Sequence, residues 1–179
     1  MSENGADVNA GDNNDWTPLQ AAPNNGYERL VALLIDKGGD VNAGNKSGWT
    51  PLLRALVRGC YWVAKVLIDS GANVNAHDRD GWTLLFRSSN AGKKAVAELL
   101  IEKGADVNIS DIGGWTPLLQ ASSKGHKEIV KLLSKGADIN ARDRDGRTAW
   151  LQKMALRQWQ DSLSRREQTQ SDLHLNECI

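Results

Sequence analysis

Apolar positions along the chain form short helical patterns that come in pairs. In residues 45–77, Leu52 and Leu56 lie on one side of a first expected helix, and Val63 and Leu67 lie on one side of a second. Polar, glycine-containing stretches separate the two helices from each other and from the next pair. Since neither helix is long enough to bury a core by itself, each pair depends on its neighbours. The pattern therefore predicts an all-α chain of stacked helix pairs.

The helix pairs recur with a constant period. The threonine before each first helix stands at 17, 50, 83, 116 and 148, so successive copies are 33 residues apart until the last, which is one residue short. Four copies have a tryptophan before this threonine: Trp16, Trp49, Trp82 and Trp115. A period of this length, with two short helices in each unit, predicts a solenoid rather than one compact core.

Threonine and glycine are placed to begin and end the helices. In the second unit, Thr50 can cap the first helix, and Pro51 suits its first turn. Gly59 ends that helix, and Gly71 falls where the C-terminus of the second helix favours a left-handed residue. Glycines at the equivalent positions of other units are Gly26, Gly92 and Gly125 between the helices and Gly38, Gly104 and Gly136 after the second helix.

These recurring motifs resemble the ankyrin repeat. They are the Thr-Pro-Leu opening, a glycine between the helices, Gly-Ala-Asp-Val-Asn at 104–108 and Gly-His-Lys-Glu-Ile-Val at 125–130. The resemblance covers roughly residues 5–150. It implies an all-α solenoid whose loops project as hairpin-like fingers beside the first helices and form a concave surface with them. It also implies a protein-binding module without catalysis.

The repeats divide the chain at regular boundaries. Residues 1–11 form a partial repeat, because Gly-Ala-Asp-Val-Asn-Ala at 5–10 is the tail of a unit without its helices. Full repeats are expected at 12–44, 45–77, 78–110 and 111–142. Residues 143–168 form a C-terminal cap repeat, with one continuous helix at 149–168, and residues 169–179 form a flexible tail. Because the array begins in mid-repeat, we expect a fragment of a longer array or a shortened gene product.

Three departures from the family pattern carry structural expectations. The histidine that usually follows Thr-Pro-Leu is replaced by Gln20, Leu53, Phe86, Leu119 and Leu151. We therefore expect apolar contacts to replace much of the hydrogen bonding between neighbouring loops. Pro23 should weaken the end of the first helix. Asp15 occupies a turn position that other units give to glycine, and Asp tolerates a positive φ better than most residues.

Charge and cysteine content restrict the environment of the protein. Lys+Arg and Asp+Glu both number 22, so the net charge is zero and offers no bulk attraction to nucleic acid or membranes. Cys60 and Cys178 are too isolated to form a disulfide framework. No apolar run approaches the ~20 residues of a membrane span, and the N-terminus lacks a signal-peptide pattern. We expect an intracellular protein, either cytoplasmic or nuclear.

The tryptophans form the main candidate binding site. The resemblance places each of them at the base of a finger, facing the concave side. The adjacent first-helix position contributes Arg54 and Arg87, then Gln120 and Gln152, and Arg147 ends the row. We call this set the Trp/Arg stripe: Trp16, Trp49, Trp82, Trp115, Arg54, Arg87 and Arg147. Trp and Arg are enriched in binding hot spots, so the stripe predicts a surface for a protein or extended peptide. The alternative is that the indoles are structural spacers between repeats.

Nucleotide or single-stranded nucleic-acid binding is a second alternative, because indoles can stack on bases for ~1–3 kcal/mol each. Charge argues against it. The finger segments at 78–80 and 143–145 both read Asp-Arg-Asp, and such mixed charge makes a poor phosphate track. Nucleic acid is therefore not the expected partner.

The same Asp-Arg-Asp segments could suggest an enzyme or a metal site. They fall at the same phase of two repeats, however, where fingertip turns require polar residues. Asp78 also begins like a calcium loop, but Ser89 stands where a glutamate is needed. His77, His126 and His174 are scattered, without Cys or carboxylates at ligand spacing. No glycine-rich phosphate loop follows a strand. We therefore expect no catalysis, no metal and no cofactor.

Two further features concern the outer side and the fingers. Tyr61 and Trp62 begin a second helix on the convex side, where partial packing against the next unit competes with a role in weak self-association of an otherwise monomeric protein. The resemblance also implies that finger asparagines can be hydroxylated. They map to Asn42, Asn75, Asn108 and Asn140, although the tight turn explains asparagine equally well.

Overall fold

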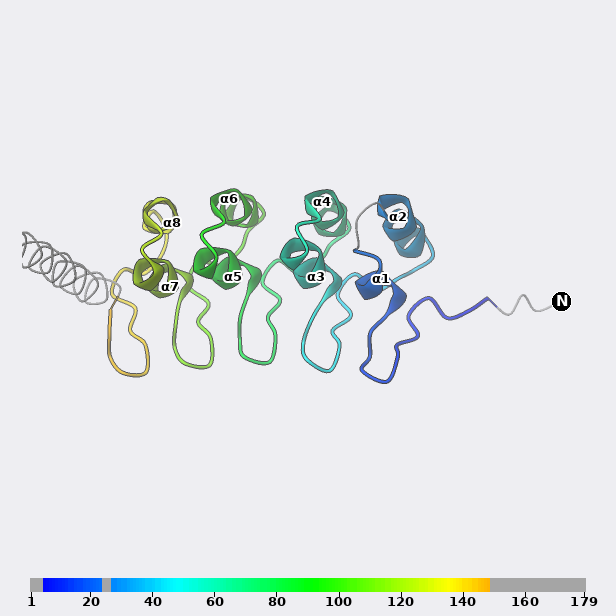
Figure 1. The fold of residues 1–179 in the computed structure, drawn as a ribbon, viewed down its shortest axis with the longest axis horizontal. Coiled ribbons are helices and arrows are strands. Elements are labelled where there is room, and N and C mark those ends of the chain that lie inside the picture. The colour runs from blue at the N-terminus through cyan, green and yellow to red at the C-terminus, as the bar shows by residue number, and fades with distance from the viewer. Residues whose placement is uncertain (1–4, 24–26, 149–179) are drawn as a thin grey trace, which may run out of the picture.

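The chain forms a row of helix pairs with long loops on one side (Figure 1). The computed structural model describes residues 5–23 and 27–148. In these residues the helices are α1 (Pro18–Ala21), α2 (Glu28–Asp36), α3 (Pro51–Val57), α4 (Tyr61–Asp69), α5 (Leu84–Asn90), α6 (Lys94–Glu102), α7 (Pro117–Lys124) and α8 (Lys127–Leu133). The predicted all-α solenoid is confirmed.

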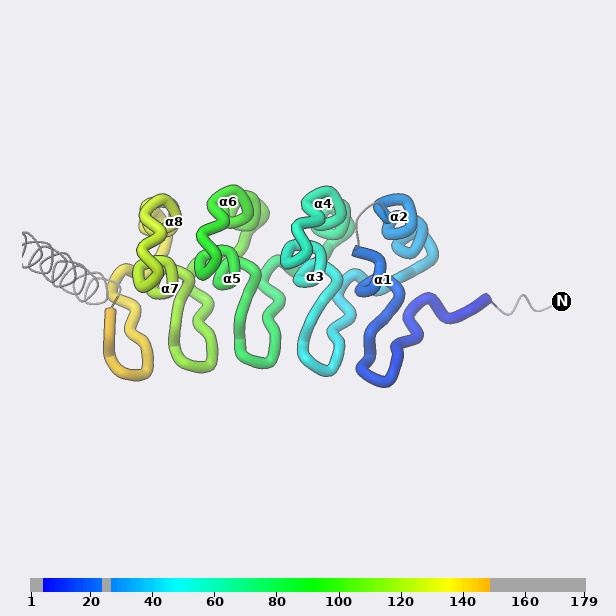
Figure 2. The backbone as a smooth tube through the Cα atoms, viewed as in Figure 1, coloured from blue at the N-terminus to red at the C-terminus, as the bar shows by residue number. Residues whose placement is uncertain are grey.

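The helices form two layers. The inner helices α1, α3, α5 and α7 lie between the outer helices α2, α4, α6 and α8 and the loops. These loops, at 5–16, 37–49, 70–82, 103–115 and 134–147, are called the fingers, and they hang side by side as narrow hairpins (Figure 2). Because each unit repeats the same local plan, equivalent residues of successive units lie in rows along the molecule.

The inner helices begin where the sequence predicts. The hydroxyls of Thr17, Thr50, Thr83 and Thr116 each accept a hydrogen bond from the backbone N–H three residues later. Such a cap contributes typically about 1 kcal/mol. Proline follows the threonine in α1, α3 and α7. The N–H that proline lacks would have no acceptor within the helix at this position.

Glycine ends most of the helices as expected, with one exception. Gly59 and Gly71 have φ of 76° and 90°, a left-handed conformation that costs glycine little. Gly136 does not act in this way, because α8 ends earlier, with Ser134 as its C-cap. The outer helices α2, α4 and α6 have 9 residues and α8 has 7. The shorter final interval of the repeat therefore shortens α8. Gly26 lies outside the described residues.

The first full repeat departs from the others where the sequence predicts. Helix α1 has only 4 residues and ends at Ala21, before Pro23. This agrees with the expected weakening, since proline cannot donate the next helical hydrogen bond. Asp15 has a φ of 61° and is the non-glycine residue with positive φ in the described chain.

Hydrogen bonds between neighbouring fingers are retained, contrary to expectation. In the first repeat, Gln20 replaces histidine and its amide donates to the carbonyls of Ala43 and Trp49 in the next finger. Backbone N–H groups join each finger to the one before it, in the pairs Lys46–Asn14, Arg79–Ser47, Ile112–Asp80 and Arg144–Gly113. At the histidine position itself the expected apolar residues Leu53, Phe86 and Leu119 are buried. The fingers nevertheless remain hydrogen-bonded because they pair mainly through their backbones, which does not depend on that position.

Some predictions lie outside the described residues. The cap repeat at 143–168 is described only to residue 148, and the tail at 169–179 is not described. The continuous helix at 149–168, Leu151 and Gln152 belong to the same part of the chain. The other repeat boundaries agree with the positions of the helix pairs but stay predictions.

Candidate binding surface

A turn at the tip of each finger positions the tryptophan of the stripe. The carboxylate of Asp78 accepts hydrogen bonds of 3.0 Å from the N–H groups of Asp80 and Trp82. The same two hydrogen bonds, to the second and fourth residues onward, are made by Asp12, Asn45, Asp111 and Asp143. The fourth residue is the tryptophan in four units and Arg147 in the last. The local turn therefore holds every one of these backbones in the same orientation.

Arginines of the next unit stack on the indoles. The guanidinium carbon of Arg54 in α3 lies 4.6 Å from the ring centre of Trp16. The guanidinium carbon of Arg87 in α5 lies 5.0 Å from Trp49 and 5.2 Å from Trp82. The structure thus brings the predicted residues together as alternating rings and cations. Each of these arginines also joins one repeat to the repeat before it.

Arg87 is the most connected residue of the stripe. Besides its two indole contacts, its guanidinium forms an ion pair with Asp78, whose side chain is buried. Trp82 in turn contacts Phe86, with ring centres 5.1 Å apart. The Nε atom of Arg87 is buried and has no hydrogen-bond partner among the described residues. The side chain is therefore held by stacking and by one carboxylate.

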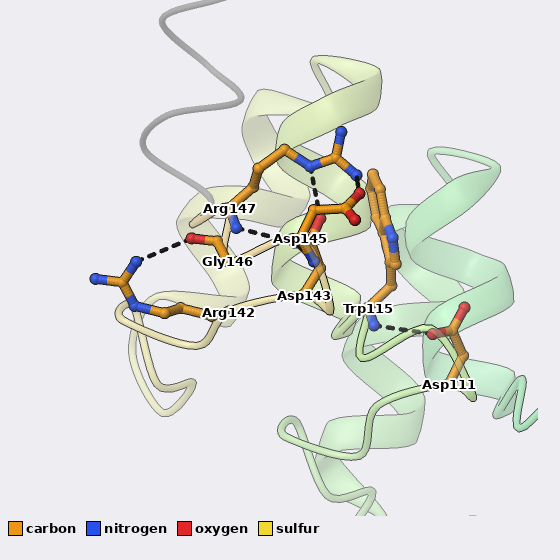
Figure 3. Close-up of polar contacts among 7 residues, drawn as sticks. All are labelled: Asp111, Trp115, Arg142, Asp143, Asp145, Gly146 and Arg147. Atoms are coloured by element: carbon orange, nitrogen blue, oxygen red, sulfur yellow. Dashed lines mark hydrogen bonds and ion pairs between the residues drawn. The ribbon is translucent and has the colours of Figure 1, made fainter.

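Arg147 closes the stripe at the last finger (Figure 3). Its Nε donates to Asp143 over 2.9 Å, its guanidinium also pairs with Asp145, and its guanidinium carbon lies 5.9 Å from the ring of Trp115. Burial raises the pKa of Asp143, but the hydrogen bonds and charge of Arg147 lower it more, so that this pKa lies below its usual value. The Arg147 pKa is raised by its hydrogen bond to Asp143. Both shifts favour the ionised form of the group concerned.

The stripe is interrupted between the third and fourth repeats. Gln120 occupies the arginine position, and its amide donates to the side chain of Asn90 over 2.6 Å. The small buried residues Ser89 and Ala121 allow α5 and α7 to approach closely, and α5 packs more extensively against α7 than against α3. Direct helix packing thus replaces the arginine link at this junction.

The indoles are neither fully buried nor fully exposed. Trp16, Trp49, Trp82 and Trp115 all have intermediate exposure. Part of each ring is used within the molecule by the stacked arginines, and part remains accessible. The stripe therefore links neighbouring repeats and also leaves part of each indole accessible to solvent.

The comparison with protein families agrees with this architecture. The family model of ankyrin repeats (3 copies) matches residues 1–78 and 71–143. The chain belongs to the ankyrin-repeat family. Ankyrin repeats are in general protein–protein interaction modules without catalytic activity. No curated protein matched the sequence in a separate comparison.

The finger asparagines of the ankyrin units have structural partners. The side-chain oxygens of Asn42, Asn75 and Asn108 accept hydrogen bonds of 2.7–2.8 Å from backbone N–H groups of the next finger. Asn9 makes the same bond in the first finger. Linking the fingers is therefore one reason for asparagine at these positions. Asn140 is exposed, and hydroxylation of the four predicted asparagines stays a prediction.

The residues considered for catalysis or metal binding take part in the finger turns. Asp78 and Asp143 accept backbone hydrogen bonds, as fingertip turns require, and Ser89 is buried between inner helices. Within residues 5–23 and 27–148, no group of three metal-binding side chains occurs. In the same residues, no helix has the length and apolar character needed to cross a membrane.

The outer side exposes more apolar surface than the sequence analysis identified. Tyr61 and Trp62 are 50% and 57% exposed at the start of α4. Tyr27, Leu30 and Leu33, at or on α2, are also exposed and were missed. The sequence did contain a signal for Leu30, because it is equivalent to the apolar Val63 of the next repeat. Its exposure depends on which units stack against it, and residue type alone does not show that.

Proposed function

We propose that the protein is a non-catalytic scaffold or adaptor that binds a protein or extended peptide through the Trp/Arg stripe on the concave face expected for an ankyrin array. The observation that carries the proposal is the stacking of guanidinium groups on all four indoles, which remain partly accessible. Stacking holds both side chain types in place before binding, which reduces the entropy lost on association. Trp and Arg are also the residues most enriched in binding hot spots.

The test is capture of partners with the wild-type chain and with the Trp49→Ala/Trp82→Ala variant. The double substitution should weaken binding of captured partners by about 2 kcal/mol or more, roughly 30-fold. The matched control is Trp62→Ala, which removes an indole from the outer face and should leave the affinity unchanged. If the double variant binds normally while its melting temperature falls, the stripe is a structural spacer.

Base stacking is the second candidate function, and the geometry favours it less. Arg87 occupies the space between Trp49 and Trp82, so a base would have to displace it. The fingers also interleave carboxylates with cations. Quenching of tryptophan fluorescence by a panel of nucleotides, with strong salt dependence, would support this alternative over peptide binding.

The proposal includes two expectations that do not come from the site: one follows from the cysteine content and the N-terminal sequence, and the other from the family. The first is a cytoplasmic or nuclear location, which microscopy of a fluorescent fusion would test. The second is hydroxylation of Asn42, Asn75, Asn108 or Asn140. The intact mass of protein expressed in cells should then show added oxygen atoms, and an unmodified mass would refute it.

A further inference from the structure

The inner helices carry charge of one sign. Arg54 and Arg87 lie in α3 and α5, Arg58 directly follows α3, and Lys124 ends α7, whereas α1, α3, α5 and α7 contain no Asp or Glu. The outer helices, in contrast, contain both signs. The inner helices therefore present a cationic wall to the concave face, although the net charge of the chain is zero.

Two of these cations, together with Lys93, have no partner among the described residues that would neutralise them. Arg58, Lys124 and Lys93, the last in the turn between α5 and α6, are exposed and form no ion pair within the described part of the chain. Arg58 and Lys124 occupy the same position of their repeats, and Ala91 occupies it in the repeat between them. The C-terminal ends of the inner helices thus form a cationic row with a small residue in its middle.

A hollow of about 190 Å³ opens at that same point, between α3 and α5. Leu56 and Val57 of α3 line it on one side, and Trp82, Arg87 and Ala91 line it with Lys93 on the other. The lining contains no carboxylate. A cavity of ~150 Å³ accommodates a benzene molecule, so the hollow is large enough for one aromatic or large aliphatic side chain.

The hollow arises from the packing of the inner helices. At the α5–α7 junction, α5 has Ser89 and Asn90 where α3 has the larger Leu56 and Val57 at the same repeat positions. Small residues bring α5 and α7 together, whereas the larger residues keep α3 away from α5. The indole of Trp82 and the cations of Arg87 and Lys93 are thereby left beside an unfilled apolar space.

We propose that this hollow receives one large apolar side chain of an acidic peptide segment, whose carboxylates face the cations of the inner helices. The inference rests on the proposed function, because it names the partner chemistry for the same face. A peptide can place its carboxylates on one side only, toward Arg58, Lys93 and Lys124. A nucleic acid would also bring phosphates near the finger carboxylates, such as Asp80 and Asp145. Charge complementarity therefore favours an acidic peptide.

Selection from a displayed library of random twelve-residue peptides on the full chain tests this. The selected peptides should be enriched in Asp and Glu and should contain Phe, Trp, Leu, Ile or Met. Fluorescence anisotropy with the labelled selected peptides then compares protein variants. Ala91→Leu, which fills the hollow, and Lys93→Glu, which reverses a cation, should each weaken binding at least tenfold.

Matched substitutions on the outer helices serve as controls. Ala95→Leu in α6 and Lys131→Glu in α8 make the same chemical changes at exposed positions and should leave affinity unchanged. Thermal unfolding of each variant verifies that the array is folded. If Lys93 and Ala91 only support the end of α5, their substitution lowers the melting temperature without changing affinity, and the proposal is wrong.

The remaining outcomes separate this inference from the proposed function. Selected peptides without acidic enrichment that still lose affinity in the Trp49→Ala/Trp82→Ala variant would overturn the inference and support binding by the stripe. Tighter binding of a labelled twelve-nucleotide single-stranded DNA than of the selected peptides would overturn it in favour of nucleic acid. If no peptide is enriched, the inference fails, and the capture experiment with the double alanine variant decides the proposed function independently.

Discussion

At the scale of single residues, the finger turns depend on a side-chain oxygen more than on charge. Asn45 accepts the same two backbone hydrogen bonds through its amide that Asp78 and Asp143 accept through a carboxylate. Asn and Asp are the side chains that commonly close such turns on their own backbone. The carboxylate has a second role where an arginine is nearby, at Arg87 and Arg147. The negative charge at this position therefore pairs with an arginine of the stripe, whereas the side-chain oxygen accepts the backbone hydrogen bonds of the turn.

Replacing Asp143 by asparagine should keep the turn and reduce the acid sensitivity of the fold. Burial raises the pKa of Asp143, but the hydrogen bonds and charge of Arg147 bring it below the usual 3.8. The folded state therefore favours the ionised form, and the stabilisation is present above that usual value and is lost as pH falls through the lowered pKa. Urea unfolding across the acid range should show a smaller loss of stability for Asp143→Asn than for the wild type. An equal loss of stability with falling pH in the variant and the wild type would refute this.

A positive φ costs the turn glycines less conformational energy than it costs Asp15, which stands at the equivalent position of the first finger. A left-handed backbone costs an ordinary residue roughly 1–2 kcal/mol. A Cβ on Gly48 would in addition lie 2.9 Å from the Cα of Asp78 in the next finger. Gly48→Ala should therefore lower the free energy of unfolding by at least about 1 kcal/mol, whereas Asp15→Gly should raise it by up to about 1 kcal/mol. Chemical denaturation of both variants measures this, and equal effects of the same sign would contradict the argument.

At the scale of helices, equivalent elements differ in what covers them. Leu30 in α2 and Val63 in α4 occupy the same repeat position, yet they are 41% and 3% exposed. In α6 the equivalent residue, Val96, is buried and faces Leu56 of the preceding repeat across the hollow. The same apolar pattern thus becomes core when another unit stacks on that side. Helix α2 has no such neighbour among the described residues.

This difference in exposure predicts that replacing the two side chains by alanine lowers the stability of the array by unequal amounts. Val63→Ala should destabilise the array by about 2 kcal/mol, because it removes a buried side chain. Leu30→Ala should cost less than about 1 kcal/mol, because much of the side chain remains in water in the folded state. Thermal and denaturant unfolding of the two variants provides the comparison. A larger effect at Leu30 would show that another part of the chain covers α2.

At the scale of the whole molecule, the junctions between ankyrin repeats are not equivalent. The third and fourth repeats pack closely through α5 and α7, whereas the second and third leave a hollow bridged by Arg87 and the indoles. The two sides of the array also differ, since the inner side carries the stripe and the outer side exposes Tyr61 and Trp62. The two sides of the molecule are therefore chemically distinct.

If the outer aromatic pair mediates self-association, the effect should appear in the whole protein at high concentration. Sedimentation coefficients of the wild type should rise with concentration, and Trp62→Lys should abolish the rise, because a charge would replace exposed apolar surface. Trp49→Ala, on the inner side, serves as the control and should leave the rise unchanged. Concentration-independent sedimentation of the wild type would show that the protein is monomeric and that this pair has another role.

The sequence by itself determined the features that depend on neighbours along the chain. Threonine caps, the glycines after most helices, the short α1 before Pro23 and the positive φ of Asp15 all follow from hydrogen bonds and steric limits within a few residues. Periodicity then extended one unit to an all-α solenoid, and it placed the tryptophans at equivalent positions. The stripe could be proposed in this way, although its role remained open.

Only the tertiary structure decided how the units meet. The stacking of Arg54 and Arg87 on the preceding indoles, the finger-to-finger hydrogen bonds, the hollow beside α3 and the exposure of Leu30 all join or compare residues about one repeat apart. They depend on side-chain sizes at a junction, such as Leu56 and Val57 of α3 compared with Ser89 and Asn90 at the same positions of α5. Because two units with the same pattern can pack closely or leave a space, the periodicity that predicts the array does not predict its surface.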